Sequence, residues 1–228
     1  MNCERKGNFC NFVIMKSMII EKINPSLREY VEEFIIPRYD EFDAGHRRDH
    51  VEMVVEQSVV LAQYYDVDIN MVYAIAAYHD TGLVEGRKYH HIVSGEIVKA
   101  DVKLREWFDE YQIEIMAEAV TDHRASNDHE PRSIYGKIVA EADRVIDSEI
   151  IVRRTIQYGL THYPHLNKEG HYNRFVEHMK EKYAHGGYLK LWILQSPNAQ
   201  RLDSFRNLLR DEEQVKLLFE KMWEELVE

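Results

Sequence analysis

The sequence predicts an all-α protein that folds as a single-domain helical bundle. Apolar residues recur at helical spacing over most of the 228 residues, and no run alternates convincingly with the two-residue period of a strand. Hydrophobic residues make up 45% of the chain and charged residues 30%, which leaves enough apolar material for a sizeable core. We expect a leader at residues 1–20 and one helical domain over residues 21–228.

Three helices are expected in the first part of the chain. Ser26 can cap a helix that continues through residues 27–42 and bends or breaks at Pro37. A second helix begins near residue 49 and carries a stripe of valines at helical spacing. A third helix, at residues 68–78, is apolar almost all round and is therefore expected to be buried.

The second part of the chain continues the helical pattern. Helices are expected at residues 91–100 and 107–123, and again from a Ser133 cap onward, with polar loops between them. The C-terminal segment, residues 202–226, is strongly amphipathic. Its apolar face could complete the core, as we expect, or could form a homodimer interface.

Charge and cysteine content narrow the expected partners and location. The net charge of −11 argues against nucleic acid as the main partner, because phosphate backbones select basic surfaces. No apolar run approaches the length of a membrane span, so we expect no membrane insertion. Both cysteines, Cys3 and Cys10, lie in the leader, which we expect to be mobile; Met15 could be the true start. The remaining chain cannot form a disulfide, which favours a cytoplasmic location.

His79 and Asp80 directly follow the apolar helix at residues 68–78. Adjacent residues on a helix point about 100° apart, so both side chains can reach one small target only where the backbone leaves helical geometry. A metal ion bound at this helix end would account for the pair. A capping histidine, which the helix dipole favours, would account for it as well.

Asp143 lies on the apolar stripe of its predicted helix, between Val139 and Ile146. An unpaired carboxylate in that position would lose much of its solvation or become protonated. A buried salt bridge is one explanation, and a cation held by several ligands is another. The opposite face is expected to be exposed; it carries Lys137, Glu141, Arg144 and Ser148.

Three histidines are further candidate ligands. His50 begins the second helix on its apolar side, and His46 lies one turn earlier. Two histidines at i and i+4 can bind one metal, although His46 could equally be an exposed residue at the helix start. His123 extends an apolar helical face, where a histidine is commonly a hydrogen-bonded core residue.

The order of these residues resembles a known signature. His50, the doublet His79-Asp80, and Asp143 within "AEADRVID" resemble the H…HD…D pattern of the HD-domain superfamily of metal-dependent phosphohydrolases. The segments "GHRRDHVEMVV", "AIAAYHDTG" and "GKIVAEADRVID" are similar to the corresponding helices of that family. The resemblance covers about residues 43–148 and leaves the C-terminal helices, 149–228, without a counterpart.

The resemblance implies an all-helical fold and a bound divalent transition metal. Its four ligands would be His50, His79, Asp80 and Asp143, a mixed nitrogen and oxygen set that suits Mn, Fe, Zn or Co. The metal would make water a better nucleophile toward phosphorus, and Asp80 would orient that water. Many relatives continue the doublet as His-Asp-Ile-Gly-Lys; this chain reads "HDTGLVEG", so any role of that lysine is not transferred.

Two more histidines resemble positions at which relatives hold a second metal or contact the substrate. They lie in "YHHIVSGEIV" and "AVTDHR". We favour His91 over His90, because the small residues Ser94 and Gly95 share its face, and we assign His91 and His123 catalytic roles. With them the pattern also resembles the di-iron members of the superfamily, one branch of which oxidises its substrates with O₂.

The predicted function is hydrolysis of a phosphoester in a small metabolite or nucleotide. Arg124, Arg87 and Lys88 are the expected phosphate contacts, because basic side chains near the site suit an anionic substrate, although they could be solvated surface charges. A di-iron oxygenase and a non-catalytic metal-binding or sensing domain are the alternatives.

Overall fold

The computed structural model describes residues 20–43 and 45–227, and every regular element in these residues is helical. The prediction of an all-α protein is therefore confirmed. The expectations for the leader, including Cys3, Cys10 and Met15, lie outside the described residues. None of the described helices is long and apolar enough to cross a membrane.

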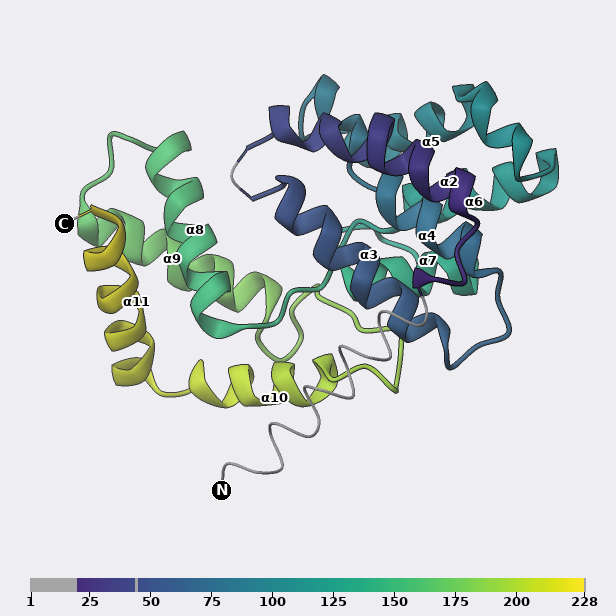
Figure 1. Ribbon diagram of the computed structural model, residues 1–228. Helices are drawn as coiled ribbons and strands as arrows, with labels where there is room; N and C mark the ends of the chain where they lie inside the picture. Colours follow the sequence, from purple (N-terminus) through teal and green to yellow (C-terminus); the bar gives the residue numbers. More distant parts are fainter. Residues whose placement is uncertain (1–19, 44, 228) are drawn as a thin grey trace. The chain divides into compact units, whose positions relative to one another are not determined.

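The chain divides into two compact units, one ending at Asp143 and one beginning at Arg144. A single domain over residues 21–228 stays a prediction, and each unit is described by itself. The first unit contains α-helices and short 3₁₀ or π segments (Figure 1). They are α2 (Pro25–Tyr30), η1 (Val31–Ile35), η2 (Ile36–Glu41), α3 (Arg48–Ala62), α4 (Ile69–Tyr78), η3 (Thr81–Glu85), α5 (His90–Ala100), η4 (Val102–Glu106), α6 (Glu110–Asp122) and α7 (Ile134–Ala142).

Helix α4 forms the centre of the first unit. It packs against α3, α6 and α7, and every residue from Met71 to Tyr78 is buried, as its nearly continuous apolar sequence predicts (Figure 1). The carboxylate of Asp68 accepts a hydrogen bond from the Asn70 amide and caps the helix, also as predicted. Because α4 is surrounded, polar side chains at its C-terminal end are held inside the protein.

The first helix begins slightly earlier than the sequence suggested. Asn24, and not Ser26, is the capping residue, since its side-chain oxygen accepts hydrogen bonds from the amides of Ser26 and Leu27. Pro25 occupies the first helical position, where its fixed φ and missing N–H are tolerated. The α-helix ends at Tyr30, earlier than expected, and a π segment continues to Ile35. The path changes to a 3₁₀ segment at Ile36, next to the predicted break at Pro37.

The polar face expected on residues 137–148 is partly buried. Helix α7 packs against α3, α4 and α6, so more than one of its faces is covered, and Glu141 is fully buried. Arg144 is also buried. It follows the end of α7, where the helical periodicity that predicted its exposure no longer applies.

The second unit consists of α8 (Ser148–His162), α9 (Lys168–Lys182), α10 (Asn198–Leu208) and α11 (Glu212–Val227). The amphipathic C-terminal segment therefore forms two helices. Helix α11 packs against α8 and buries Phe219, Met222 and Trp223, and the Phe219 ring lies 5.4 Å from that of Phe175 on α9. These side chains belong to the core of the unit, together with Ile151, Val152 and Ile156 of α8.

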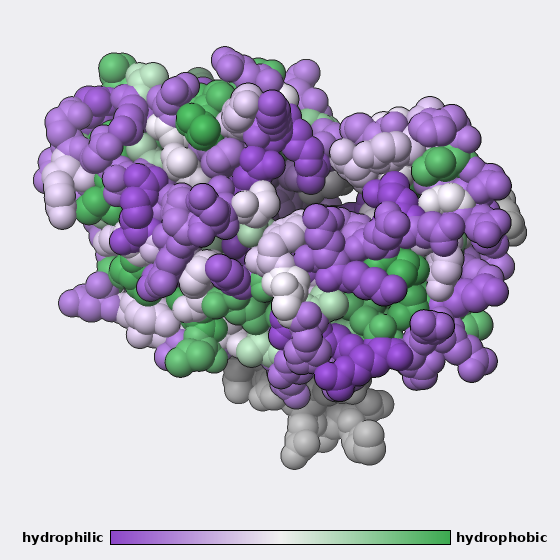
Figure 2. Space-filling model, turned by 180° about the vertical axis from the view of Figure 1, so that it is seen from behind, coloured by the Kyte–Doolittle hydropathy of each residue, from purple (hydrophilic) through white to green (hydrophobic). Residues whose placement is uncertain are grey.

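The face of the molecule in Figure 2 is mostly hydrophilic, with smaller apolar patches between charged side chains. Leu194 and Val102 are among the exposed large apolar residues. Scattered exposed apolar residues are normal on protein surfaces.

Candidate metal centre

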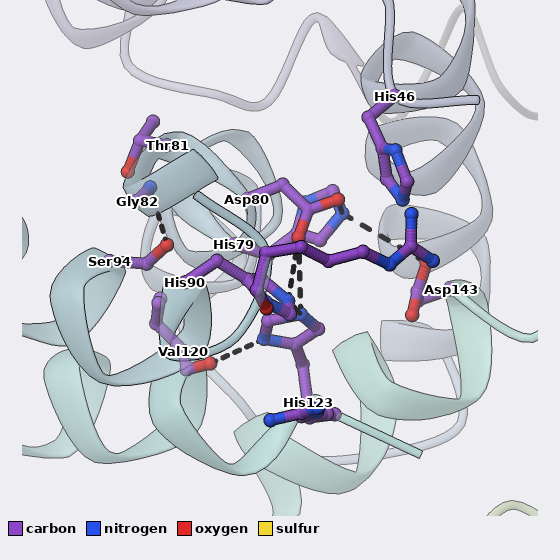
Figure 3. A network of polar contacts seen from close by, with 12 residues as sticks. His46, His79, Asp80, Thr81, Gly82, His90, Ser94, Val120, His123 and Asp143 are labelled. Carbon is purple, nitrogen blue, oxygen red and sulfur yellow. Dashed lines mark hydrogen bonds and ion pairs between the residues drawn. The ribbon is translucent and has the colours of Figure 1, made fainter. Parts of the chain in front are cut away.

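Polar side chains from five helices converge inside the first unit, and each of them lies at or next to a helix terminus. Most of them surround one carboxylate, that of Asp80 (Figure 3). The cluster contains His50 at the start of α3, His79 and Asp80 at the end of α4, His90 at the start of α5, His123 at the end of α6, and Asp143 at the end of α7.

The end of α4 allows two adjacent residues to face the same site. The helix ends at Tyr78, and Asp80 has φ −110° and ψ 7°, which is outside the α-helical region. The Nδ1 of His79 lies 2.7 Å from the Ala76 carbonyl oxygen, which directs Nε2 toward Asp80. The change in backbone direction removes the angular separation that two neighbouring helical residues would have.

The two oxygens of Asp80 face two different pairs of imidazoles. Oδ2 lies 3.3 Å from Nε2 of His79 and 3.6 Å from Nε2 of His50. Oδ1 lies 3.2 Å from Nε2 of His90 and 3.3 Å from Nε2 of His123. Two triads of potential metal ligands result, and Asp80 is the residue that they share.

Asp143 lies next to the triad of His50, His79 and Asp80. Its Oδ1 lies 3.3 Å from Nε2 of His50 and 4.0 Å from Nε2 of His79. The Asp143 side chain is 23% exposed, whereas that of Asp80 is 5% exposed. Asp143 is therefore the carboxylate of the cluster that reaches toward solvent.

These separations fit a shared cation. Bonds of about 2.1 Å place neighbouring ligand atoms about 3.0–3.4 Å apart and opposite ones about 4.2 Å apart. The measured nitrogen–oxygen separations in the cluster run from 3.2 to 4.0 Å. A divalent ion could therefore contact the members of a triad without a large rearrangement.

The tautomers of three histidines point to the same conclusion. The Nδ1 atoms of His79, His90 and His123 lie 2.7, 2.8 and 2.6 Å from backbone carbonyl oxygens. A carbonyl only accepts, so each Nδ1 carries the hydrogen, and in the neutral ring each Nε2 presents a lone pair to the cluster. Backbone carbonyls commonly orient metal-ligating histidines in this way.

Without a cation, the buried carboxylates depend on protonated imidazoles. Burial raises the pKa of Asp80, but His79, His123 and His50 outweigh it and hold that pKa well below its usual range. Burial lowers the pKa of His50, yet its hydrogen bonds to Asp143 and Asp80 raise it to about 9. Protons and a metal ion would therefore compete for the same sites.

Comparison with known proteins gives the family of this segment. Residues 47–146 match the family model of the HD domain. This segment is an HD domain. The match contains all the residues of the cluster described above, and it confirms the predicted resemblance of this segment to the HD-domain superfamily. No curated protein and no solved structure matches the chain.

The HD domain brings His90, and not the expected His91, to Asp80. Ser94 lies four residues after His90 and three after His91, so helical spacing could not separate the two. The His91 ring is buried, and its centroid lies 5.5 Å from that of His90. Burial and the nearby Arg124 lower the pKa of His91 to about 4, so this ring is neutral at pH 7.

The expected phosphate contacts lie on or beside the loop between η3 and α5. Arg124, which follows α6, donates from Nη1 to the Lys88 carbonyl at 2.8 Å and so connects the end of α6 to this loop. Arg87 is 3.8 Å from Asp43, and the Lys88 ammonium lies 4.9 Å from the centre of the Tyr89 ring. Arg87 and Lys88 thus lie just before His90 in the sequence, and Arg124 reaches the same loop from the end of α6.

His46 is next to the cluster and belongs to neither triad. Its Nδ1 lies 2.8 Å from Oδ1 of Asp43, and its ring centroid is 5.7 Å from that of His50. The i, i+4 spacing that made it a candidate ligand therefore brings the two rings together in an edge-to-face contact.

Gly82 is a residue of the HD domain whose importance the sequence did not indicate. Its amide donates to the Ser94 hydroxyl at 2.8 Å, a bond visible in Figure 3. A Cβ atom at this position would lie 2.1 Å from the His90 carbonyl oxygen and 2.5 Å from the Ser94 nitrogen. Glycine therefore permits the close approach of η3 and α5 that brings His90 to Asp80.

Proposed function

We propose that this HD domain is a phosphohydrolase that binds two divalent transition metal ions and cleaves a phosphoester of a small metabolite or nucleotide. The observation that carries the proposal is the arrangement of Asp80, whose two oxygens each face a separate pair of imidazoles. The nitrogen and oxygen donors favour Mn, Fe, Zn or Co. Bound there, such an ion would polarise a phosphoryl oxygen and make water more acidic.

The two carboxylates are proposed to have different roles. Both oxygens of Asp80 face imidazole nitrogens and its side chain is 5% exposed, which suits a ligand shared by two ions. The more exposed Asp143 is better placed than Asp80 to orient water and accept its proton. Asp143 therefore takes the water-orienting role that was expected for Asp80.

The basic residues near the site are proposed to bind the substrate phosphate. Arg124 and the loop residues Arg87 and Lys88 supply positive charge in a chain whose net charge is −11. Local cations of this kind would attract a small anion, whereas the overall charge disfavours a nucleic acid. We propose His91 and His123 as further catalytic candidates, with His123 mainly a ligand because its Nε2 faces Asp80.

The paired triads also support a second candidate, a di-iron oxygenase. A di-iron oxygenase needs two groups of ligands with a carboxylate in common, and the two triads that share Asp80 would meet this need. The two candidates differ in iron content and in O₂ consumption. A non-catalytic metal-binding domain would bind metal and gain thermal stability from it, as the hydrolase would, but it would turn over no substrate. A cytoplasmic location and a homodimer stay predictions.

Elemental analysis of protein purified without added metal, followed by a phosphate-release assay on a panel of phosphoesters, tests the proposal. We expect up to two transition metal ions per chain and phosphate release that Asp80→Asn abolishes. Asp128→Asn, on an exposed loop, is the matched control and should keep both properties. Stoichiometric metal without phosphate release from any phosphoester would refute the hydrolase assignment, and O₂ uptake by an iron-loaded protein would favour the oxygenase.

A further inference from the structure

The hydrogen bonding at the end of α4 involves a residue that is distant in the sequence. In a continuing α-helix, the amide of Asp80 would donate to the Ala76 carbonyl. Here the ring of His79 places Nδ1 2.7 Å from that carbonyl oxygen. The Asp80 amide donates to the hydroxyl of Tyr39, 3.1 Å away. Tyr39 therefore supplies an acceptor at the point where the helix ends.

The same hydroxyl also acts as a donor. It donates to the Ala77 carbonyl oxygen at 2.9 Å, so one phenol group connects a carbonyl before the doublet to the Asp80 amide within it. Tyr39 belongs to η2 and is fully buried, and its ring centroid lies 6.2 Å from that of His79. The ring is thus packed against one member of the doublet, while its hydroxyl holds the backbone of the other.

We propose that Tyr39 is a positioning residue for the His79-Asp80 doublet. Its hydroxyl fixes the backbone where Asp80 leaves helical geometry, and this allows both side chains to face one centre. The inference rests on the proposed metal-binding function. Groups that orient ligands typically change metal affinity about 10-fold to 100-fold when they are removed, and we expect an effect of this size for Tyr39→Phe.

Cobalt binding to the metal-free protein tests the inference, because the visible absorption of Co²⁺ reports ligand geometry independently of catalysis. The experiment compares wild type, Tyr39→Phe and Tyr78→Phe. Tyr78 is a matched control on α4: it is fully buried, and its hydroxyl donates to Asp101 at 2.5 Å, away from the doublet backbone. Amide hydrogen exchange at Asp80, measured without metal, gives a second readout.

The inference predicts that Tyr39→Phe weakens Co²⁺ binding at least about 10-fold and changes the absorption bands. Its Asp80 amide should exchange faster than in wild type. Tyr78→Phe should lose thermal stability while keeping the wild-type Co²⁺ spectrum and affinity. Wild-type affinity and spectrum in Tyr39→Phe, or an equal loss in Tyr78→Phe, would overturn the inference.

The amide measurement separates this inference from the function that it rests on. If wild type binds no Co²⁺, the proposed metal centre fails, and exchange at Asp80 alone decides the role of Tyr39. Faster exchange in Tyr39→Phe then supports a positioning role, and unchanged exchange excludes it. If the phenylalanine variant does not fold, 3-fluorotyrosine at position 39 replaces it. Its hydroxyl is a weaker acceptor, so Asp80 exchange should still rise, and no change would count against the inference.

Discussion

The Nε2 atoms of His90 and His123 lie 3.3 Å apart, and the Nδ1 of each ring donates a hydrogen bond to a backbone carbonyl oxygen. The two Nε2 atoms therefore face one another and the same oxygen of Asp80. A cation would be coordinated by both nitrogens and by this oxygen. The histidine pair on α5 and α6 is therefore the part of the centre that a second metal ion explains best.

Replacing His90 should remove one ion and leave the other. In His90→Gln we expect the ion of the Asp80, His90 and His123 triad, the second ion, to bind at least about 100-fold more weakly. The triad of His50, His79 and Asp80 should keep its ion. Metal content per chain after dialysis measures this. His91→Gln is the matched control and should retain both ions. Loss of metal in His91→Gln alone would show that the ligand assignment on α5 is incorrect.

Metal removal should lower the stability of the first unit. A ligand that binds only the folded state at 100 times its Kd contributes about 2.7 kcal/mol to the free energy of unfolding. We expect the melting temperature to fall by several degrees in excess chelator and to recover when a divalent ion is restored. A melting temperature that is the same with chelator and with added metal would indicate that no structural ion is bound.

Gly82→Ala should disturb the contact between η3 and α5. The added methyl group would lie 2.1 Å from the His90 carbonyl oxygen, so the backbone must move at a cost of about 1–3 kcal/mol or more. Denaturant unfolding measures the loss, and the second ion should bind more weakly because His90 shifts. Gly170→Ala is the control: its nearest neighbour atoms belong to the Leu166 side chain at 3.2 Å, and its stability should stay within about 1 kcal/mol of wild type.

His171 should make the second unit less stable in mild acid. It is buried beside Trp223, and burial, Arg174 and His165 lower its pKa. The unfolded chain therefore takes up a proton near pH 6.5 that the folded chain does not, and the free energy of unfolding falls as the pH drops below that value. The slope from one such group is at most about 1.4 kcal/mol per pH unit.

Thermal unfolding of wild type and His171→Phe between pH 5 and pH 8 measures this contribution. The variant should show a shallower decline below about pH 6.5, the ordinary pKa of a histidine. His129→Gln, which removes an exposed histidine from the first unit, should follow the wild-type curve. Parallel curves for wild type and His171→Phe would mean that His171 titrates alike in the folded and unfolded chain.

Much of the centre could be predicted from local sequence. The apolar run before His79-Asp80 predicted a buried helix end, and the position of Asp143 on an apolar stripe placed that carboxylate inside the protein. The first prediction depends on a nearly continuous apolar sequence and the second on helical periodicity. The family resemblance then connected residues that periodicity alone could not bring together.

The remaining features depend on contacts that periodicity does not describe. The choice between His90 and His91 is set by where α5 begins and by its approach to Gly82. The role of Tyr39 follows from a hydrogen bond to a residue 41 positions away. Glu141 is buried because three helices surround α7, which an amphipathic pattern does not show.

The candidate ligands of the centre lie in the first turn of a helix or just after its last residue, and none lies in the middle of a helix. The connecting segments leave from these same ends, so their length and composition can change while the bundle keeps the donor atoms in place. If the proposed hydrolase function holds, changes in the segment 86–89 could alter substrate preference while the cluster of histidines and aspartates is retained. Swapping that segment between members of the superfamily would exploit this separation in the engineering of new specificities.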